Sequence, residues 1–132
     1  MIAGVGVDIV DINRMERILE SSRSHRFLER VFSAEEIRVC EASAHPAQGF
    51  AARFAAKEAM AKALGTGFTR GVTPARITIQ GGERSRPTIA LTDQALAVAR
   101  SMDVARIHVS LTHTPQSACA LVVVEYDRSP RE

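Results

Sequence analysis

An alanine-rich segment over residues 49–64 constrains the fold more than any other part of the sequence, and Gly65 and Gly67 follow it directly. Alanine has the highest helix propensity, and glycine just after the last turn is a common helix stop. The segment therefore predicts a long helix that ends before Gly65. Its small surface allows close packing against a sheet; the alanines stand at positions 51, 52, 55, 56, 59, 61 and 63.

Other segments show the patterns of shorter helices and strands. Valine- and glycine-rich residues 2–10 predict a first strand that ends near Asp8. A helix is expected from about Asn13, and Ser33 and Glu36 have the spacing of a capping box, which predicts another helix start. The remaining expected elements are a loop over 42–48, strands over 76–80, 88–91, 107–111 and 118–126, and a helix over 92–102. This mixture lacks strict βαβ alternation, so we expect an α+β fold with a small mixed or antiparallel sheet packed against the alanine-rich helix.

Length and composition limit the class of protein. The 132 residues fit one compact domain, expected over residues 1–126, with a frayed polar tail over residues 127–132. A net charge of +2 is too small to indicate nucleic acid as a partner. Cys40 and Cys119 form no CxxC pair, which fits a reducing compartment. The first ten residues lack a basic leader and contain an aspartate, so they predict neither a signal peptide nor a membrane span. We therefore expect a cytoplasmic protein with no membrane partner.

Polar side chains recur on one face of the predicted long helix. Phe54, Glu58 and Lys62 are spaced four residues apart and share that face. In isolation, Glu58 and Lys62 are most simply a surface ion pair. The glycines after the helix permit another interpretation, because a backbone without side chains can approach a phosphate and Lys62 would supply a positive charge.

Two strand ends also carry candidate groups. Asp8 follows an apolar strand, where it is either a turn or capping residue or, together with Glu58, an oxygen ligand of one hard cation such as Mg²⁺. Alternation places His108, Ser110 and Thr112 on one face of a later strand, and His113 stands at its end. A strand-end histidine can bind a ligand, although a structural role is the simpler interpretation.

Together these segments resemble the holo-(acyl-carrier-protein) synthases, the small trimeric type of phosphopantetheinyl transferase. The resemblance rests on GVDIV at residues 6–10, RFAAKEAMAKALGTG at residues 53–67 and VSLTHT at residues 109–114, in that order and at matching separations. It extends from Met1 to about Glu125. Residues 85–87 read Ser-Arg-Pro where the family often has Gly-Lys/Arg-Pro.

The resemblance implies a cofactor, partners and roles for particular residues. It implies a homotrimer of α+β subunits with active sites between neighbours, magnesium, coenzyme A as the donor and an apo acyl carrier protein as the acceptor. Asp8 and Glu58 would bind magnesium, and Lys62 would act in catalysis and contact the coenzyme A phosphates. The other residues expected to bind coenzyme A are Arg53, Lys57, Gly65, His113 and Thr114, and those expected to contact the carrier protein are Arg14 and Phe54.

The implied reaction transfers 4'-phosphopantetheine to a serine of the carrier, in lipid or polyketide biosynthesis, and releases adenosine 3',5'-bisphosphate. Glu58, directly or through a water molecule, is one candidate for the base that accepts the serine proton, and Lys62 is the other. A coenzyme A-dependent acyltransferase is a less suitable alternative, because it needs no paired carboxylates for magnesium. A third possibility is an oligomer that only binds a nucleotide or coenzyme.

Overall fold

The computed structural model describes residues 1–82 and 84–127 and combines helices with antiparallel sheets. Of the predicted tail over residues 127–132, all but Asp127 lies outside the described residues. The elements in chain order are β1 (Ile2–Asp11), α1 (Ile12–Glu20), α2 (Ser24–Val31), α3 (Ala34–Glu41), α4 (Pro46–Ala63), a 3₁₀ turn η1 (Pro74–Arg76), β2 (Ile77–Gln80), β3 (Thr88–Leu91), α5 (Asp93–Ser101), β4 (Val104–His113) and β5 (Ser117–Tyr126). The predicted α+β class is confirmed.

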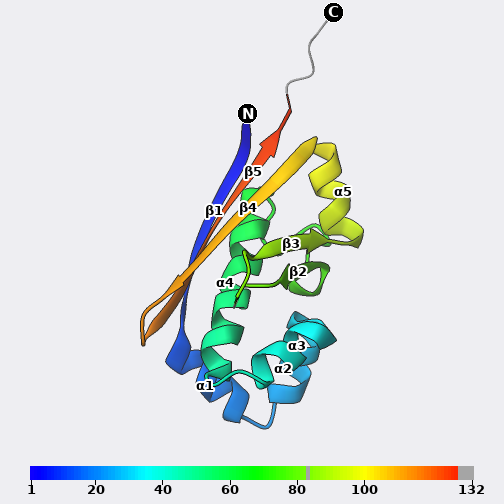
Figure 1. Cartoon of the computed structure of the whole chain (residues 1–132). Helices are drawn as coiled ribbons and strands as arrows, with labels where there is room; N and C mark the ends of the chain where they lie inside the picture. The colour runs from blue at the N-terminus through cyan, green and yellow to red at the C-terminus, as the bar shows by residue number, and fades with distance from the viewer. Residues whose placement is uncertain (83, 128–132) are drawn as a thin grey trace, which may run out of the picture.

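One three-stranded sheet organises the molecule. Its order is β1-β5-β4, and both pairings are antiparallel. The long helix α4 packs along one face of this sheet, and the β2–β3 hairpin and α5 lie beyond the helix on the side of β4 (Figure 1). The strands β1 and β4 are therefore the two edges of the sheet.

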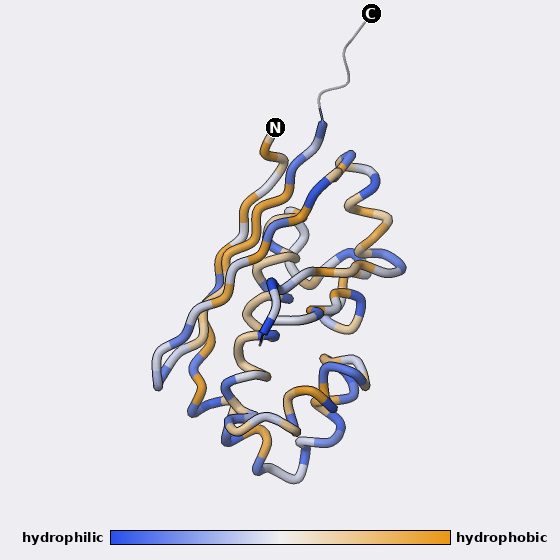
Figure 2. The backbone as a smooth tube through the Cα atoms, viewed as in Figure 1, coloured by the Kyte–Doolittle hydropathy of each residue, from blue (hydrophilic) through white to orange (hydrophobic). Residues whose placement is uncertain are grey.

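The face of the sheet that α4 does not cover is apolar along two strands. Val7 of β1 pairs with Leu121 of β5, which pairs in turn with Ser110 of β4. Val7 and Ile9 are 56% and 67% exposed, and Val5 and Leu121 are also exposed. Figure 2 shows the hydrophobic stretches that run along these neighbouring strands.

Close contact between α4 and β1 depends on glycine in the strand. A Cβ added to Gly6 would lie 1.8 Å from the carbonyl oxygen of Ala59, and one added to Gly4 would lie 2.0 Å from that of Ala63. These distances are far below van der Waals contact, so only glycine fits at either position. The alanines on the side of α4 that faces β1 also allow this close packing because their side chains are small, as the sequence predicts.

Two apolar clusters meet at α4. The C-terminal half of the helix packs with the sheet, the β2–β3 hairpin and α5. Its N-terminal half packs with α1, α2 and α3, where the tilted rings of Phe32 and Phe50 pack with their centroids 5.0 Å apart. The helix thus connects the sheet to the three N-terminal helices.

Most elements match the sequence predictions, with differences at their ends. The capping box is confirmed: Glu36 N donates to Ser33 Oγ at 3.1 Å and Ser33 N donates to Glu36 Oε1 at 2.9 Å. The loop expected over 42–48 is partly wrong, since α4 already begins at Pro46, whose fixed φ suits a first helical position. The helix α2 is not among the sequence predictions. Within the described part of the chain, no helix has the length and apolar character to cross a membrane.

Candidate active site

Lys62 and Asp8 meet where α4 crosses the edge strand β1. Lys62 Nζ donates hydrogen bonds to Asp8 Oδ1 and to the carbonyl oxygen of Val7, both at 3.0 Å. The side chain of Asp8 is 12% exposed and that of Lys62 is 51% exposed, so the ammonium lies between the carboxylate and the solvent. The sequence suggested a surface ion pair between Glu58 and Lys62 on one helix. In the structure Lys62 pairs with Asp8 instead, and this ion pair connects α4 to β1.

Glu58 stands one helical turn before Lys62 and faces the same carboxylate. Burial raises the pKa of Glu58 above its ordinary 4.5, and the charge of the nearby Asp8 carboxylate raises that pKa further. The charges of Lys62 and Arg14 act in the opposite direction. Two carboxyl groups at one site resist simultaneous ionisation. A proton or a cation would relieve the repulsion between them.

One carboxylate oxygen of Asp8 also indicates that this site would be stabilised by a cation. Asp8 Oδ2 is buried and finds no hydrogen-bond partner among the described residues. A buried carboxylate oxygen without a partner is costly, and a hard cation that prefers oxygen ligands would satisfy it. No group of three or more His, Cys, Asp or Glu side chains suited to a metal occurs in the described ranges. Two carboxylates fit Mg²⁺, which keeps several waters and binds substrate phosphates.

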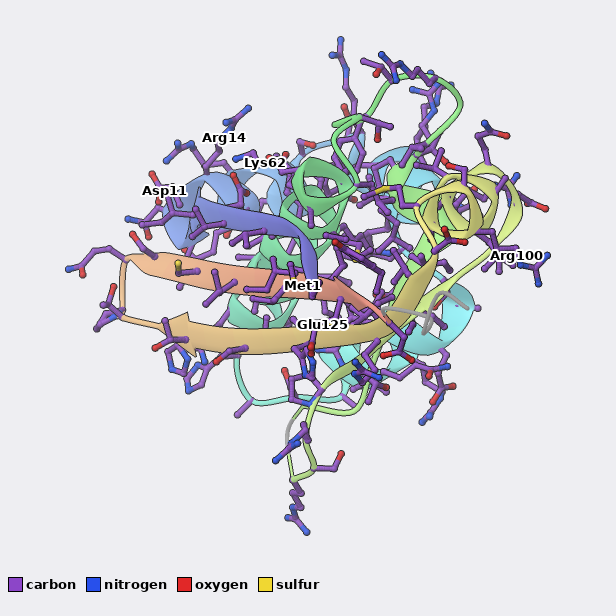
Figure 3. All side chains as sticks on the ribbon, turned by 90° about the horizontal axis from the view of Figure 1, so that it is seen from above. Met1, Asp11, Arg14, Lys62, Arg100 and Glu125 are labelled. Atoms are coloured by element: carbon purple, nitrogen blue, oxygen red, sulfur yellow. The ribbon has the colours of Figure 1, made fainter. Side chains whose placement is uncertain are left out.

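A pocket of about 200 Å³ opens beside Glu58. Arg14 of α1, Phe27 of α2 and Phe54 of α4 line it. Figure 3 shows Arg14 and Lys62 on the same side of the molecule, next to β1. The residues expected to contact a partner protein, Arg14 and Phe54, are thus placed next to the carboxylate expected to act in catalysis.

The helix ends next to Lys62 in an open glycine turn. Gly65 has φ +81°, and its N–H donates to the carbonyl oxygen of Lys62 at 2.9 Å. This left-handed conformation favours glycine. A Cβ at Gly65 would meet nothing within 4 Å, so the space over the backbone is accessible to a ligand.

Arg53 and His113 lie at the other edge of the sheet. A pocket of about 460 Å³ contains both, together with Gly82 and Gln48. Gln48 Nε2 lies 3.0 Å from His113 Nε2, and Arg53 Nη2 donates to the carbonyl oxygen of Gly81 at 3.0 Å. Arg53 is only 5% exposed, and its Nε has no partner among the described residues. This pocket does not include Glu58, nor does the pocket beside Glu58 include Arg53 or His113.

Thr114 belongs to the same edge but has a structural contact. Its Oγ1 accepts hydrogen bonds from the backbone N–H groups of Gln116 at 3.2 Å and Ser117 at 3.1 Å. These bonds shape the turn from β4 to β5. Apart from Lys57, the residues expected to bind magnesium or coenzyme A thus fall into two groups on opposite edges of the sheet, which we name half-site A (Asp8, Glu58, Lys62 and Gly65) and half-site B (Arg53, His113 and Thr114).

The structure places Lys57, the remaining residue expected to bind coenzyme A, away from both half-sites. Its side chain is fully buried and its Nζ donates to Glu36 Oε1 at 2.9 Å, to the carbonyl oxygen of Pro74 at 3.0 Å and to that of Ile77. Burial lowers the pKa of Lys57, and the charge of Glu36 raises it. An ammonium with three protein acceptors and no exposure has no access to a phosphate.

Two contacts of this region were not found from the sequence. Glu36 was recognised as a capping-box residue but not as the partner of Lys57, which is 21 positions away. Phe27 lines the pocket beside Glu58, a role that is not among the sequence predictions. Its apolar character within a charged helix was the available signal, because such a residue usually packs against another element.

Comparisons with known proteins show which family the chain is similar to. A sequence model of the 4'-phosphopantetheinyl transferase superfamily matches residues 4–122. A holo-[acyl-carrier-protein] synthase of Syntrophus aciditrophicus is 40% identical over 125 residues, which cover 95% of this chain and 97% of that protein.

Solved structures of similar proteins have the same fold. The crystal structure of holo-[acyl-carrier-protein] synthase from Neisseria meningitidis has a TM-score of 0.83 and 32% identity, and the match covers 95% of this chain and 99% of that one. The corresponding synthase from Bacillus anthracis, solved in complex with CoA (3',5'-ADP), has a TM-score of 0.77 and 31% identity, over 96% and 99% of the two chains.

Proposed function

The chain belongs to the 4'-phosphopantetheinyl transferase superfamily, and we propose that it catalyses the reaction for which its relatives are named. It transfers the 4'-phosphopantetheine group of coenzyme A to a serine of an apo acyl carrier protein. The observation that carries this proposal is the Asp8–Glu58 carboxyl pair beside Lys62, with one buried carboxylate oxygen that lacks a partner among the described residues. The proposal includes a single domain over residues 1–126 and a role in lipid or polyketide biosynthesis in the cytoplasm.

Asp8 and Glu58 are the residues that would hold magnesium. When bound there, the ion supplies positive charge to the pyrophosphate oxygens of coenzyme A. Lys62 adds a second positive charge at the same place, since its half-exposed ammonium projects past Asp8 toward the solvent. The open backbone at Gly65 leaves room for the phosphates to approach this ammonium.

The transfer exchanges one phosphorus–oxygen bond for another. The carrier serine oxygen forms a bond to the β-phosphorus of coenzyme A, the anhydride bond to the α-phosphate breaks, and adenosine 3',5'-bisphosphate leaves with the bonding electrons. The serine proton moves to Glu58. The position of Glu58 favours this role, because it lines the pocket beside Arg14 and Phe54, the residues expected to contact the carrier protein. Lys62 is the less suitable base, since its hydrogens already serve Asp8 and Val7.

Two features support assembly into a homotrimer. The uncovered face of β1 and β5 exposes Val7, Ile9 and Leu121, and exposed apolar surface of this kind marks interfaces. Half-sites A and B lie at opposite edges of one sheet, so a complete set of coenzyme A contacts requires two copies of the chain. Head-to-tail contacts that repeat around an axis would join half-site A of one copy to half-site B of the next and close the ring.

Val7→Arg tests this interface. We expect the variant to sediment as a monomer and to lose most of its turnover, because an arginine would be buried among apolar side chains of the assembly. The melting temperature of the monomer itself should barely change, since Val7 is already 56% exposed within one chain. Sedimentation velocity and a turnover assay measure these effects, with Thr73→Arg, an exposed position before η1, as the control. An active oligomer of Val7→Arg would contradict the interface.

The carrier protein would bind over α1, α2 and the pocket beside Glu58. Phe54 supplies an apolar wall to that pocket and Arg14 stands at it. The other exposed basic residues of this surface are Arg17, Arg23, Arg26 and Arg30. This combination suits an acidic helical partner that is attracted by charge and held by apolar contacts.

The reaction is tested by the intact mass of an apo acyl carrier protein after incubation with this protein, coenzyme A and magnesium. We expect a gain equal to one phosphopantetheine that is absent when a chelator replaces magnesium. Failure with fatty-acid, polyketide and peptide carriers alike would contradict the transferase. If coenzyme A still bound under those conditions, the chain would be a coenzyme-binding oligomer instead.

Magnesium is expected to stabilise the protein through Asp8 and Glu58. A ligand that binds only the folded state at 100 times its dissociation constant adds about 2.7 kcal/mol. We therefore expect magnesium to raise the melting temperature by several degrees, and Asp8→Asn and Glu58→Gln to abolish most of this increase. Differential scanning fluorimetry over a magnesium titration measures it, with Asp103→Asn as a control at an exposed turn. An undiminished increase in both site variants would place the ion elsewhere.

A further inference from the structure

The buried ion pair of Lys57 and Glu36 lies where the two apolar clusters meet. Glu36 accepts hydrogen bonds from Lys57 Nζ and from Ser33 N, both at 2.9 Å, and from Ile79 N at 3.2 Å. Lys57 in turn donates to backbone oxygens of η1 and β2. The pair therefore connects four elements, α3, α4, η1 and β2, at one fully buried point.

Aromatic rings connect this point to the pocket beside Glu58. Lys57 Nζ lies 5.4 Å from the ring centroid of Phe32. The Phe32 ring packs edge-to-face on Phe27 at 6.1 Å, and Phe27 packs on Phe54 at the same centroid distance. Phe27 and Phe54 line the pocket, and we name these two rings the aromatic wall. Phe32 thus touches the ion pair on one side and the wall on the other.

Directional contacts fix geometry more strictly than apolar packing does. Two apolar clusters in contact can slide by a fraction of an ångström at little cost, whereas hydrogen bonds to Ser33, Ile79 and Ile77 hold only at particular positions. Polar pairs in a core are known to specify one arrangement in some proteins. Here the arrangement concerned is that of α2 and α3 relative to α4, and therefore the shape of the aromatic wall.

We propose that Lys57 and Glu36 are positioning residues for the acceptor protein: the pair holds the aromatic wall in the shape that receives an apolar side chain of the carrier next to its target serine. This inference rests on the proposed transferase function. It assigns the pair no contact with coenzyme A or magnesium. Loss of the pair therefore weakens the carrier contact selectively, while the coenzyme A contacts remain intact.

The double variant Lys57→Met with Glu36→Gln tests the proposal. It removes both charges together, so neither is left buried alone, and the new amide oxygen at position 36 can still accept from Ser33 N. We expect the carrier KM and the dissociation constant of a serine-free carrier to rise about tenfold, a size typical of residues coupled through packing. The KM for coenzyme A and kcat at saturating carrier should change less than about twofold, within ordinary variation for sites that share no partner.

A matched control separates positioning from stability. Met102→Ala removes apolar contacts from the other cluster, near α5, without touching the pair or the aromatic wall. Both variants are assayed at temperatures equally far below their own melting midpoints. An equal rise in the carrier KM for Met102→Ala would show that lost stability is the cause and would overturn the proposal.

A double-mutant cycle with Phe27→Leu tests whether the ion pair affects carrier binding through the aromatic wall. If the pair acts through the wall, Phe27→Leu should raise the carrier KM much less in the double variant than in the natural protein. If the two changes raised the carrier KM independently, so that their fold-changes multiplied, the ion pair would not act through the aromatic wall. Should the double variant fail to fold, Glu36→Asp keeps both charges but shortens the side chain by one methylene, so that the carboxylate lies farther from Lys57. This variant should raise the carrier KM in the same selective way.

The natural protein provides the reference for both proposals. If it neither binds nor modifies any carrier, the transferase function fails. If it modifies a carrier and the pair variants bind that carrier as it does, only the positioning role fails.

Discussion

Glu58→Gln is expected to lower kcat about 10³-fold. The loss of a general base alone removes about 10²- to 10⁴-fold. A glutamine also lacks the charge that would bind magnesium opposite Asp8, so the variant should need more magnesium for saturation. The loss of the base should persist at saturating magnesium. The rate is measured by the appearance of modified carrier protein in intact-mass spectra over time.

The stability of Glu58→Gln should not fall with its kcat. Burial and the charge of Asp8 disfavour the ionised form of Glu58, as its raised pKa indicates. A neutral glutamine removes this repulsion, so without magnesium the variant should melt no lower than the natural protein. Glu41→Gln, at the exposed end of α3, makes the same chemical change as a control. Near-normal turnover of Glu58→Gln would contradict its roles as base and ligand together.

Gly6→Ala is the second change with a large expected effect. The added Cβ would lie 1.8 Å from the carbonyl oxygen of Ala59, and backbone cannot rotate away as a side chain would. Either β1 must move away from α4 or the helix must bend. Both responses disturb Asp8 and Glu58, which face each other across this contact. We expect a loss of about 3 kcal/mol or more in the free energy of unfolding, at the upper end for overpacked cores.

Urea unfolding of Gly6→Ala and Gly67→Ala separates crowding from the general effect of replacing glycine. Gly67 has φ +56° but open space around its missing Cβ, so alanine there should cost only about 1 kcal/mol. If Gly6→Ala were no worse than this control, the close contact between β1 and α4 would be incorrect.

Local patterns in the sequence predict the elements well because their causes are local. Alanine content and a glycine stop predict the end of α4, and the spacing of Ser33 and Glu36 predicts the start of α3. The first turn of α4 falls in the loop predicted over 42–48, because a proline often marks a loop, although Pro46 here occupies the first helical position. The helix α2 depends on packing of Phe27 and Val31 against other elements rather than on its own composition.

The candidate site is predicted less completely because it depends on contacts distant in sequence. Helical spacing places Glu58 and Lys62 on one face, but it does not show that Lys62 pairs with Asp8, which is 54 residues away. Lys57, next to Glu58 in the sequence, points to the opposite side and is buried on Glu36. A motif therefore identifies the helix that carries the chemistry, while only the packing of the helix decides which of two adjacent charged residues faces the substrate.

The separation of half-sites A and B also determines how mixtures of defective chains would behave. A chain with Glu58→Gln retains half-site B, and a chain with His113→Ala retains half-site A. When subunits of both kinds assemble into one ring of the proposed trimer, a single junction brings together the two undamaged halves. Two inactive preparations should therefore regain activity when they are mixed and allowed to exchange subunits. Each mixed ring would have one active junction, and its other junctions would remain inactive.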